Sequence, residues 1–163
     1  MSKAILFIEH AAGEPRRASL ECLGAALSAG VDVTAVVTGP GADAAATALT
    51  ASGASAVCHL TGAESWSSDR SALDLAALVT ETGAVAFLAA ATGTGKDVAP
   101  RVAAHLDSTL FTDITSLESV GDALQTQRPW LAGKVIATCT SASSVSHLSW
   151  AIERRSTWPS IRL

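Results

Sequence analysis

The segment AAATGTGKDVAPRVAAHL, residues 89–106, holds the densest group of residues that could contact a ligand. Gly93 and Gly95 would let the backbone come close to a bound group, while Thr92, Thr94 and Lys96 would add hydroxyls and a positive charge. The first N–H groups of a helix have no partner within it, so a glycine loop that leads into a helix favours an anion. These five residues are therefore a candidate phosphate site.

The match of this segment to known phosphate motifs is poor. A Walker A loop would need glycine where Ala90 stands, and Ser or Thr where Asp97 follows the lysine. A GxGxxG motif fails because Val98 takes the place of the third glycine. Asp97 is a good residue to begin a helix and a poor neighbour for a phosphate. Local chemistry thus favours a helix cap at Asp97 over an anion site, and both interpretations stay open.

Other residues that could do chemistry are scattered. Glu9 and His10 end an apolar run and could be functional, but solvated loop residues are the preferred interpretation. Arg128 and Asp113 could form an ion pair. The four histidines and three cysteines show no spacing typical of metal ligands, and the cysteines are expected to be reduced and buried. No serine lies in a GxSxG motif. We therefore expect no metal and no catalytic residue.

Composition excludes several classes of protein. Of the 163 residues, 48% are apolar and 16% are charged, which indicates a folded chain that can bury a core. The net charge of −4 is unsuited to binding nucleic acid. The apolar run near the N-terminus is too short for a signal peptide or a membrane span. A cytoplasmic location is the expectation.

Apolar runs rich in β-formers alternate with helical patterns along the first two thirds of the chain. Each parallel pair of strands needs a crossover, so this alternation predicts an α/β fold, a mostly parallel Rossmann-like sheet with helices on both faces. The predicted strands are residues 3–9, 31–39, 54–61 and 84–91, and the predicted helices are residues 15–29, 40–53, 69–83 and 97–107.

The pattern changes after residue 110. Short alternating runs predict an antiparallel hairpin near residues 114–139, added to the sheet. The domain is expected to span residues 1–139. Residues 140–163 form an atypical, Ser-rich tail in which residues 144–152 could be a last strand.

Three segments in order, ILFIEH, TGTGKDVAPRVAAHLDSTLFTDITSLE and RPWLAGKVIAT, resemble the N-terminal domain of the electron transfer flavoprotein alpha subunit. The resemblance covers about 140 residues. It implies a domain that docks a beta-type subunit and a FAD domain, that forms a heterodimer, and that catalyses nothing alone. It also implies that AMP, where present, is held by the beta partner.

The resemblance also bears on individual residues. It implies that the loop containing Thr92 is mainly architectural, with its counterpart in the beta subunit binding the nucleotide. The family pattern RPxYxGK is matched at the hairpin except for its tyrosine, which is Leu131 here. The candidate partner-contacting residues of the hairpin are Arg128, Pro129, Trp130, Gly133 and Lys134.

After Thr140 the family continues into a FAD domain, and none of its flavin-contacting motifs follows in this sequence. FAD is therefore expected in the parent complex and not on this chain. A separate subunit, a truncated or frameshifted product and a domain adapted to another task all remain open, as does self-association. The leading hypothesis is an electron-transfer docking module, and the alternative is a small adenine-nucleotide-binding protein that uses residues 92–96.

Overall fold

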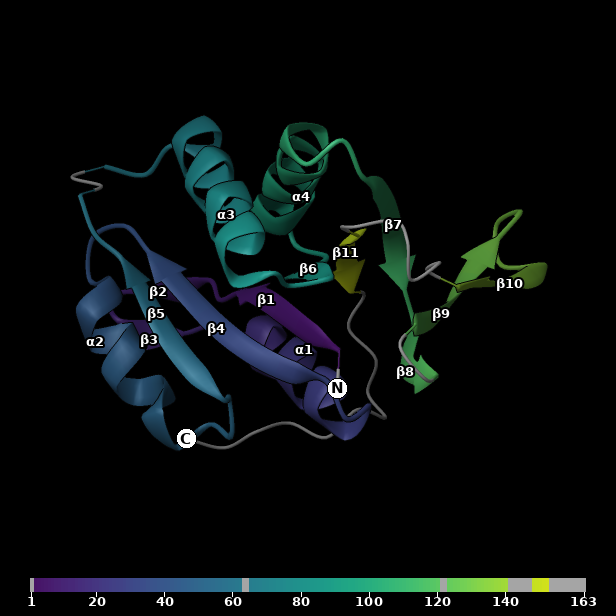
Figure 1. The fold of residues 1–163 in the computed structure, drawn as a ribbon, viewed down its shortest axis with the longest axis horizontal. Helices are drawn as coiled ribbons and strands as arrows, with labels where there is room; N and C mark the ends of the chain where they lie inside the picture. Colours follow the sequence, from purple (N-terminus) through teal and green to yellow (C-terminus); the bar gives the residue numbers. More distant parts are fainter. Residues whose placement is uncertain (1, 63–64, 121–122, 141–147, 153–163) are drawn as a thin grey trace.

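The computed structural model describes residues 2–62, 65–120, 123–140 and 148–152 (Figure 1). Its main sheet has six strands, and all neighbouring strands are parallel. In spatial order these are β5 (Ala56–Leu60), β4 (Asp32–Thr38), β1 (Lys3–Phe7), β6 (Ala86–Ala90), β11 (Leu148–Ile152) and β7 (Thr109–Ile114). The prediction of an α/β fold with a parallel sheet is confirmed.

Helices cover both faces of this sheet (Figure 1). One face carries α1 (Arg17–Ser28) and α2 (Ala42–Ala48), which a short 3₁₀ turn, η1 (Leu49–Ala51), continues. The other face carries α3 (Ser68–Thr82) and α4 (Gly93–His105). Each predicted helix is therefore present, although α4 begins four residues earlier than predicted. The alternating connections place β1 at the centre of the sheet, between β4 and β6.

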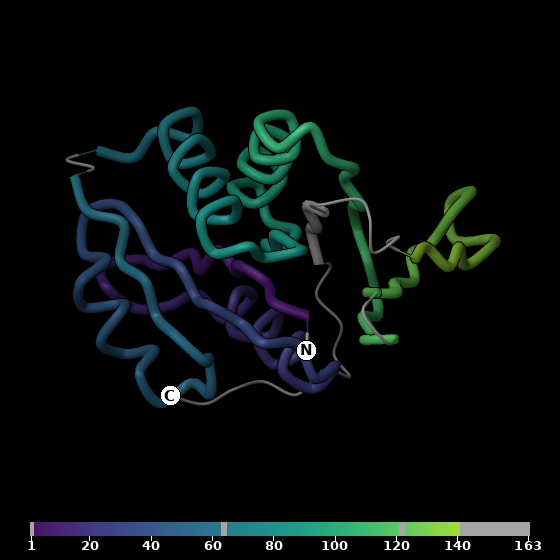
Figure 2. Tube along the Cα trace, viewed as in Figure 1, coloured from purple at the N-terminus to yellow at the C-terminus, as the bar shows by residue number. Residues whose placement is uncertain are grey.

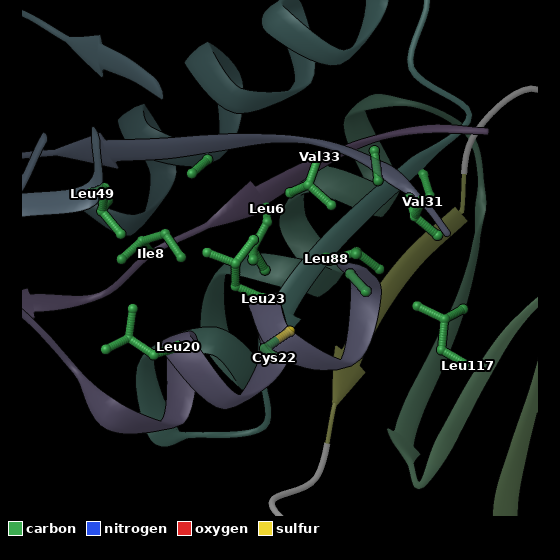
Figure 3. Packing of buried hydrophobic residues seen from close by; sticks show 14 of the residues in the cluster. Leu6, Ile8, Leu20, Cys22, Leu23, Val31, Val33, Leu49, Leu88 and Leu117 are labelled. Carbon is green, nitrogen blue, oxygen red and sulfur yellow. The ribbon is translucent and has the colours of Figure 1, made fainter. Parts of the chain in front are cut away.

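Alternation of side chains along β1 divides the core into two layers. Leu6 and Ile8 are buried on the face covered by α1 and α2, where they pack with Leu23 and Leu88 (Figure 3). Ile5 and Phe7, on the opposite face, pack with buried side chains of α3 and α4. Helices cover both faces of β1, which explains why this central strand is apolar on both sides.

A second, antiparallel sheet follows the main sheet along the chain. It consists of β8 (Ser116–Val120), β9 (Ala123–Trp130) and β10 (Val135–Thr140), with β9 in the centre. The turn between β9 and β10 extends away from the main sheet (Figure 2). This confirms the predicted antiparallel hairpin and adds a third strand to it, but the hairpin belongs to a sheet of its own and is not added to the main sheet. A small pair, β2 (His10–Ala11) and β3 (Glu14–Pro15), lies just after β1.

Two strands of the main sheet differ from the expectation that the parallel pattern stops near residue 110. β7 is its edge strand, and β11 inserts between β6 and β7. β11 falls within residues 144–152, for which the sequence suggests a last strand. Residues 141–147 and 153–163 of the tail lie outside the described residues. Insertion of a distant segment between two strands cannot be deduced from local periodicity.

The cysteines are only partly as expected. All three are free thiols, but only Cys22 is buried, while Cys58 and Cys139 are half-buried. Burial raises the pKa of the Cys22 thiol. Among the described residues, no three His, Cys, Asp or Glu side chains lie close enough together to hold a metal ion. No helix of the described ranges is long and apolar enough to cross a membrane.

Candidate functional site

A cavity of about 220 Å³ opens at the carboxyl ends of β1 and β4. The ends of these strands line it together with His10, Arg16, Trp66 and Thr94, the last of which lies in the first turn of α4. Ligands of open parallel sheets bind beyond the carboxyl ends of the strands. The cavity is therefore the candidate site, and Thr94 is the one predicted residue of 92–96 among its lining residues, whereas Lys96 lines a different hollow beside Asp113.

Glu9 is the buried acidic residue that lines this cavity. It lies two residues after the end of β1 and is only 7% exposed. The hydroxyl of Thr92 donates a hydrogen bond to its Oε1 atom, and its backbone N–H donates to Ser19 Oγ over 3.0 Å. The preferred interpretation of Glu9 as a solvated loop residue is therefore wrong. Glu9 is buried against the start of α4, where it accepts the hydrogen bond from Thr92.

Thr92 begins α4. Its backbone is extended, and its Oγ1 atom accepts a hydrogen bond from the N–H of Gly95 over 3.0 Å. The same hydroxyl donates to Glu9, so it links the cap of the helix to the end of β1. A carboxylate beside the first turn of a helix is stabilised by the positive end of the helix dipole. Glu9 thus occupies the kind of position that a bound anion would take.

Asp97 does not begin the helix, which corrects the prediction from the sequence. It lies in the second turn of α4, and its carboxylate contacts Ser68 and Arg101, the latter over 3.0 Å. These hydrogen bonds, first from Ser68 and then from Arg101, hold the pKa of Asp97 below its ordinary value. Thr92 competes better for the cap because it directly precedes the helix.

The two glycines of the segment have different surroundings. Gly95 is buried, and a Cβ there would overlap the carbonyl oxygen of Ala90 at the end of β6. Gly93 is exposed, and none of the described atoms lies within 4 Å of where its Cβ would be. Both are helical in α4, so the loop expected at residues 92–96 is the first turn of a helix. Only Gly95 needs to be glycine for packing.

Lys96 lies at the side of this turn. Its Nζ atom is 2.7 Å from the Oδ1 atom of Asp113, which has a positive φ of 55° near the end of β7. The pair is half exposed, with 51% and 38% of the two side chains accessible. Its contribution to stability is therefore small. The ion pair between Asp113 and Arg128 that the sequence suggests is therefore not formed, because Asp113 pairs with Lys96 and Arg128 donates to Thr112.

Arg128 lies in β9 and is half-buried. It donates a hydrogen bond to the hydroxyl of Thr112 over 3.1 Å, and its guanidinium carbon is 5.2 Å from the centre of the Trp130 ring. Arginine over an aromatic face is a favourable arrangement. Arg128 thus joins β9 to β7 and orients the indole of Trp130.

The far end of the β9–β10 hairpin exposes four large apolar side chains. Trp130, Leu131, Val135 and Ile136 are between 49% and 64% exposed. We call these four residues the hairpin patch. Its turn holds Leu131 and Ala132 at positive φ, together with Gly133. Several exposed apolar residues on one projecting hairpin are typical of a surface that another protein covers.

The segment residues and the hairpin residues belong to separate parts of the molecule. Thr92, Gly93, Thr94, Gly95 and Lys96 form the start of α4, whereas Arg128, Pro129 and Trp130 end β9, and Gly133 and Lys134 form the turn. Sequence reasoning missed Trp66, which lies between β5 and α3 and stacks on Phe7. A tryptophan in a polar loop after a strand is a weak signal, and no motif marked it.

A parallel sheet with helices on both faces defines the class of Rossmann-like α/β domains. Within that class, the family model of the electron transfer flavoprotein domain matches residues 4–149. Because the match covers well over half of the chain, the chain belongs to the electron transfer flavoprotein family. Members of that family carry electrons on a flavin and are not catalysts.

The cavity does not fit a whole FAD molecule. Its volume of about 220 Å³ is below the range of roughly 300–1,000 Å³ that drug-sized ligands occupy, and FAD is larger still. Its buried charged group is the Glu9 carboxylate, which would repel a pyrophosphate. The described residues at this edge therefore do not form a flavin site.

Proposed function

We propose that this chain is an alpha-type docking module of an electron transfer flavoprotein. It binds a beta-type subunit and a FAD domain, and it supports electron transfer without catalysing a reaction of its own. Membership of the family supports the electron-transfer part of this proposal. The observation that carries the docking part is the hairpin patch, which projects from the main sheet and exposes Trp130 and its neighbours.

The chemistry of the hairpin suits a protein partner. Trp130 lies beside the guanidinium of Arg128, and tryptophan and arginine are enriched where proteins meet. Pro129, Gly133 and Lys134 shape and flank this surface. We propose these residues as partner contacts, with the beta-type subunit as the partner that forms the heterodimer. A cytoplasmic location remains a prediction from the sequence.

The assembly can be tested by mixing the purified chain with a beta-type subunit and a FAD domain and measuring the mass of the species in solution. The proposal predicts a complex of defined stoichiometry whose visible spectrum shows bound flavin. The chain alone, purified with excess FAD, should show no flavin absorption. Stoichiometric flavin on the isolated chain would contradict the proposal.

The alternative function, binding of an adenine nucleotide by Thr92, Gly93, Thr94, Gly95 and Lys96, remains a prediction. The position of the cavity at the start of α4 favours it. The buried carboxylate of Glu9 on the Thr92 hydroxyl weighs against a phosphate at the same place. Calorimetry with AMP and with ATP distinguishes the two, since absence of heat at millimolar nucleotide removes the alternative.

A further inference from the structure

We propose that the cavity at the ends of β1 and β4 binds a small aromatic amine, and that Glu9 makes it prefer a protonated amino group over a phosphate. This goes beyond the docking function, which involves the hairpin patch at a different part of the molecule. The ligand class follows from the charge of the cavity and from its one large aromatic wall.

The first observation is a buried carboxylate without a cation. Glu9 lines the cavity and is 7% exposed, and within the described ranges no Lys, Arg or His nitrogen lies at ion-pair distance from it. Its side chain receives a hydrogen bond from Thr92 at Oε1. Burying a carboxylate is costly unless it is paired. An ammonium group in the cavity would supply the missing positive charge.

The second observation is the aromatic wall. The ring of Trp66 stacks on Phe7, with 5.7 Å between centroids and 17° between planes. Trp66 is still 42% exposed, and it lines the same cavity as Glu9. An indole face attracts both flat rings and cations. A ligand that combines an aromatic ring with an ammonium group matches both features.

The remaining polar groups fit this assignment. The Nε2 atom of His10 lies 3.0 Å from the carbonyl oxygen of Thr38, so that nitrogen donates to the protein and is not offered to a ligand. Arg16 is exposed, and water screens its charge. It would at most contact an acidic substituent at the rim. The buried part of the cavity therefore presents an acceptor, which suits an N–H donor.

Phosphate would meet the opposite situation. The start of a helix normally attracts an anion. At the start of α4, however, the Thr92 hydroxyl already donates to Glu9. A phosphate placed there would approach a buried carboxylate, where water screens the repulsion poorly. Glu9 thus reverses the preference that the start of a helix has by itself.

The test is a calorimetric titration of the full chain with three probes: phenethylamine, 3-phenylpropionate and AMP. Phenethylamine and 3-phenylpropionate have similar rings and chains and differ in charge. Phenethylamine is expected to bind at least about tenfold more tightly than either anion. Glu9→Gln keeps an acceptor for Thr92. It should weaken the binding of phenethylamine by at least about tenfold and strengthen the binding of AMP.

Trp66→Ala is the second variant, because Trp66 is 42% exposed and lies outside the helices and strands, so its loss should leave the fold intact. It should weaken phenethylamine without making the cavity prefer anions. The proposal is overturned if phenethylamine gives no heat at 10 mM, a concentration about tenfold above a millimolar Kd. It is also overturned if AMP or 3-phenylpropionate binds the wild-type chain as tightly. Neither result would affect the docking proposal, which is measured with a protein partner.

Discussion

Gly95, in the first turn of α4, lies against Ala90 at the end of β6 so closely that any Cβ on the glycine would overlap the carbonyl oxygen of Ala90. That oxygen also accepts a hydrogen bond from the N–H of Thr92 over 2.8 Å. The chain therefore turns directly from strand to helix, with no loop of its own between them. This contact fixes where α4 begins relative to the cavity.

Replacing Gly95 by alanine should destabilise the domain strongly. The added methyl group meets backbone, which cannot move aside as a flexible side chain can, so we expect a loss of about 3 kcal/mol in the free energy of unfolding. Gly93→Ala is the matched control, since its Cβ would meet none of the described atoms and should change stability by less than about 1 kcal/mol. Urea unfolding measures both, and equal effects of the two substitutions would refute the packing argument.

Removing the hydroxyl of Thr92 should also destabilise α4. Thr92→Ala loses the helix cap and leaves the buried Glu9 carboxylate without its donor, so a loss of about 2 kcal/mol is expected. Thr92→Ser keeps the hydroxyl and should stay within about 0.5 kcal/mol of the wild type. Chemical denaturation followed by circular dichroism compares the two variants. If serine were as harmful as alanine, the methyl group and not the hydroxyl would be responsible.

The start of α4 shows where sequence reasoning succeeds and where it fails. The amphipathic pattern from Val98 onward predicts a helix correctly. The sequence predicts its first residue at Asp97, because an acidic cap is favourable and two glycines suggest a loop. Tertiary packing decides otherwise, because Gly95 is required by its contact with β6. The observed helix therefore begins four residues before the predicted start. Local propensity does not describe the contact with β6 that causes this difference.

The pH dependence of stability should include a contribution from Asp97. Hydrogen bonds from Ser68 and Arg101 lower the pKa of Asp97, so its contribution is present above the ordinary aspartate pKa of about 3.9 and is lost as the pH falls through the lower, folded-state pKa. Asp97→Asn should therefore flatten the fall in unfolding free energy on the acid side. Denaturation between about pH 5 and pH 2 measures this fall.

Glu81→Gln serves as the control. It removes an exposed carboxylate near the end of α3, whereas Asp97 contacts Ser68 at the start of that helix. It should leave the acid side of the profile as in the wild type. The contact across helices also involves Asp69, which pairs with Arg101. An Asp97→Asn profile that superimposes on the wild type would show that the contacts of the Asp97 carboxylate with Ser68 and Arg101 do not hold in solution.

The hairpin patch should matter little to folding. Trp130 is 50% exposed, and its contact with Arg128 is a surface interaction that contributes about 0.5–1 kcal/mol. We expect Trp130→Ala to lower the free energy of unfolding by no more than that amount. Leu124 is buried and lies in the same strand, β9, so Leu124→Ala should lower the free energy of unfolding by about 2–5 kcal/mol. Thermal unfolding of both variants checks the contrast.

The candidate site was only partly predictable. Strand ends at one edge of a parallel sheet can be inferred from periodicity, and this places Glu9 and the start of α4 together. The burial of Glu9 could not be inferred, because it depends on the hydroxyl of Thr92, 83 positions away in the chain. The same holds for β11, which inserts between β6 and β7 from the far end of the chain. Long-range contacts of this kind leave no local pattern.

The central claim, that the chain docks a beta-type subunit through its hairpin patch, is tested most directly by the affinity of that complex. Surface plasmon resonance with the immobilised beta-type subunit should show specific binding by the wild type and a loss of about tenfold or more for Trp130→Ala. Leu73→Ala removes a side chain of similar exposure, 49%, from α3 and should bind like the wild type. Unchanged affinity of Trp130→Ala, with a folded variant, would contradict the account.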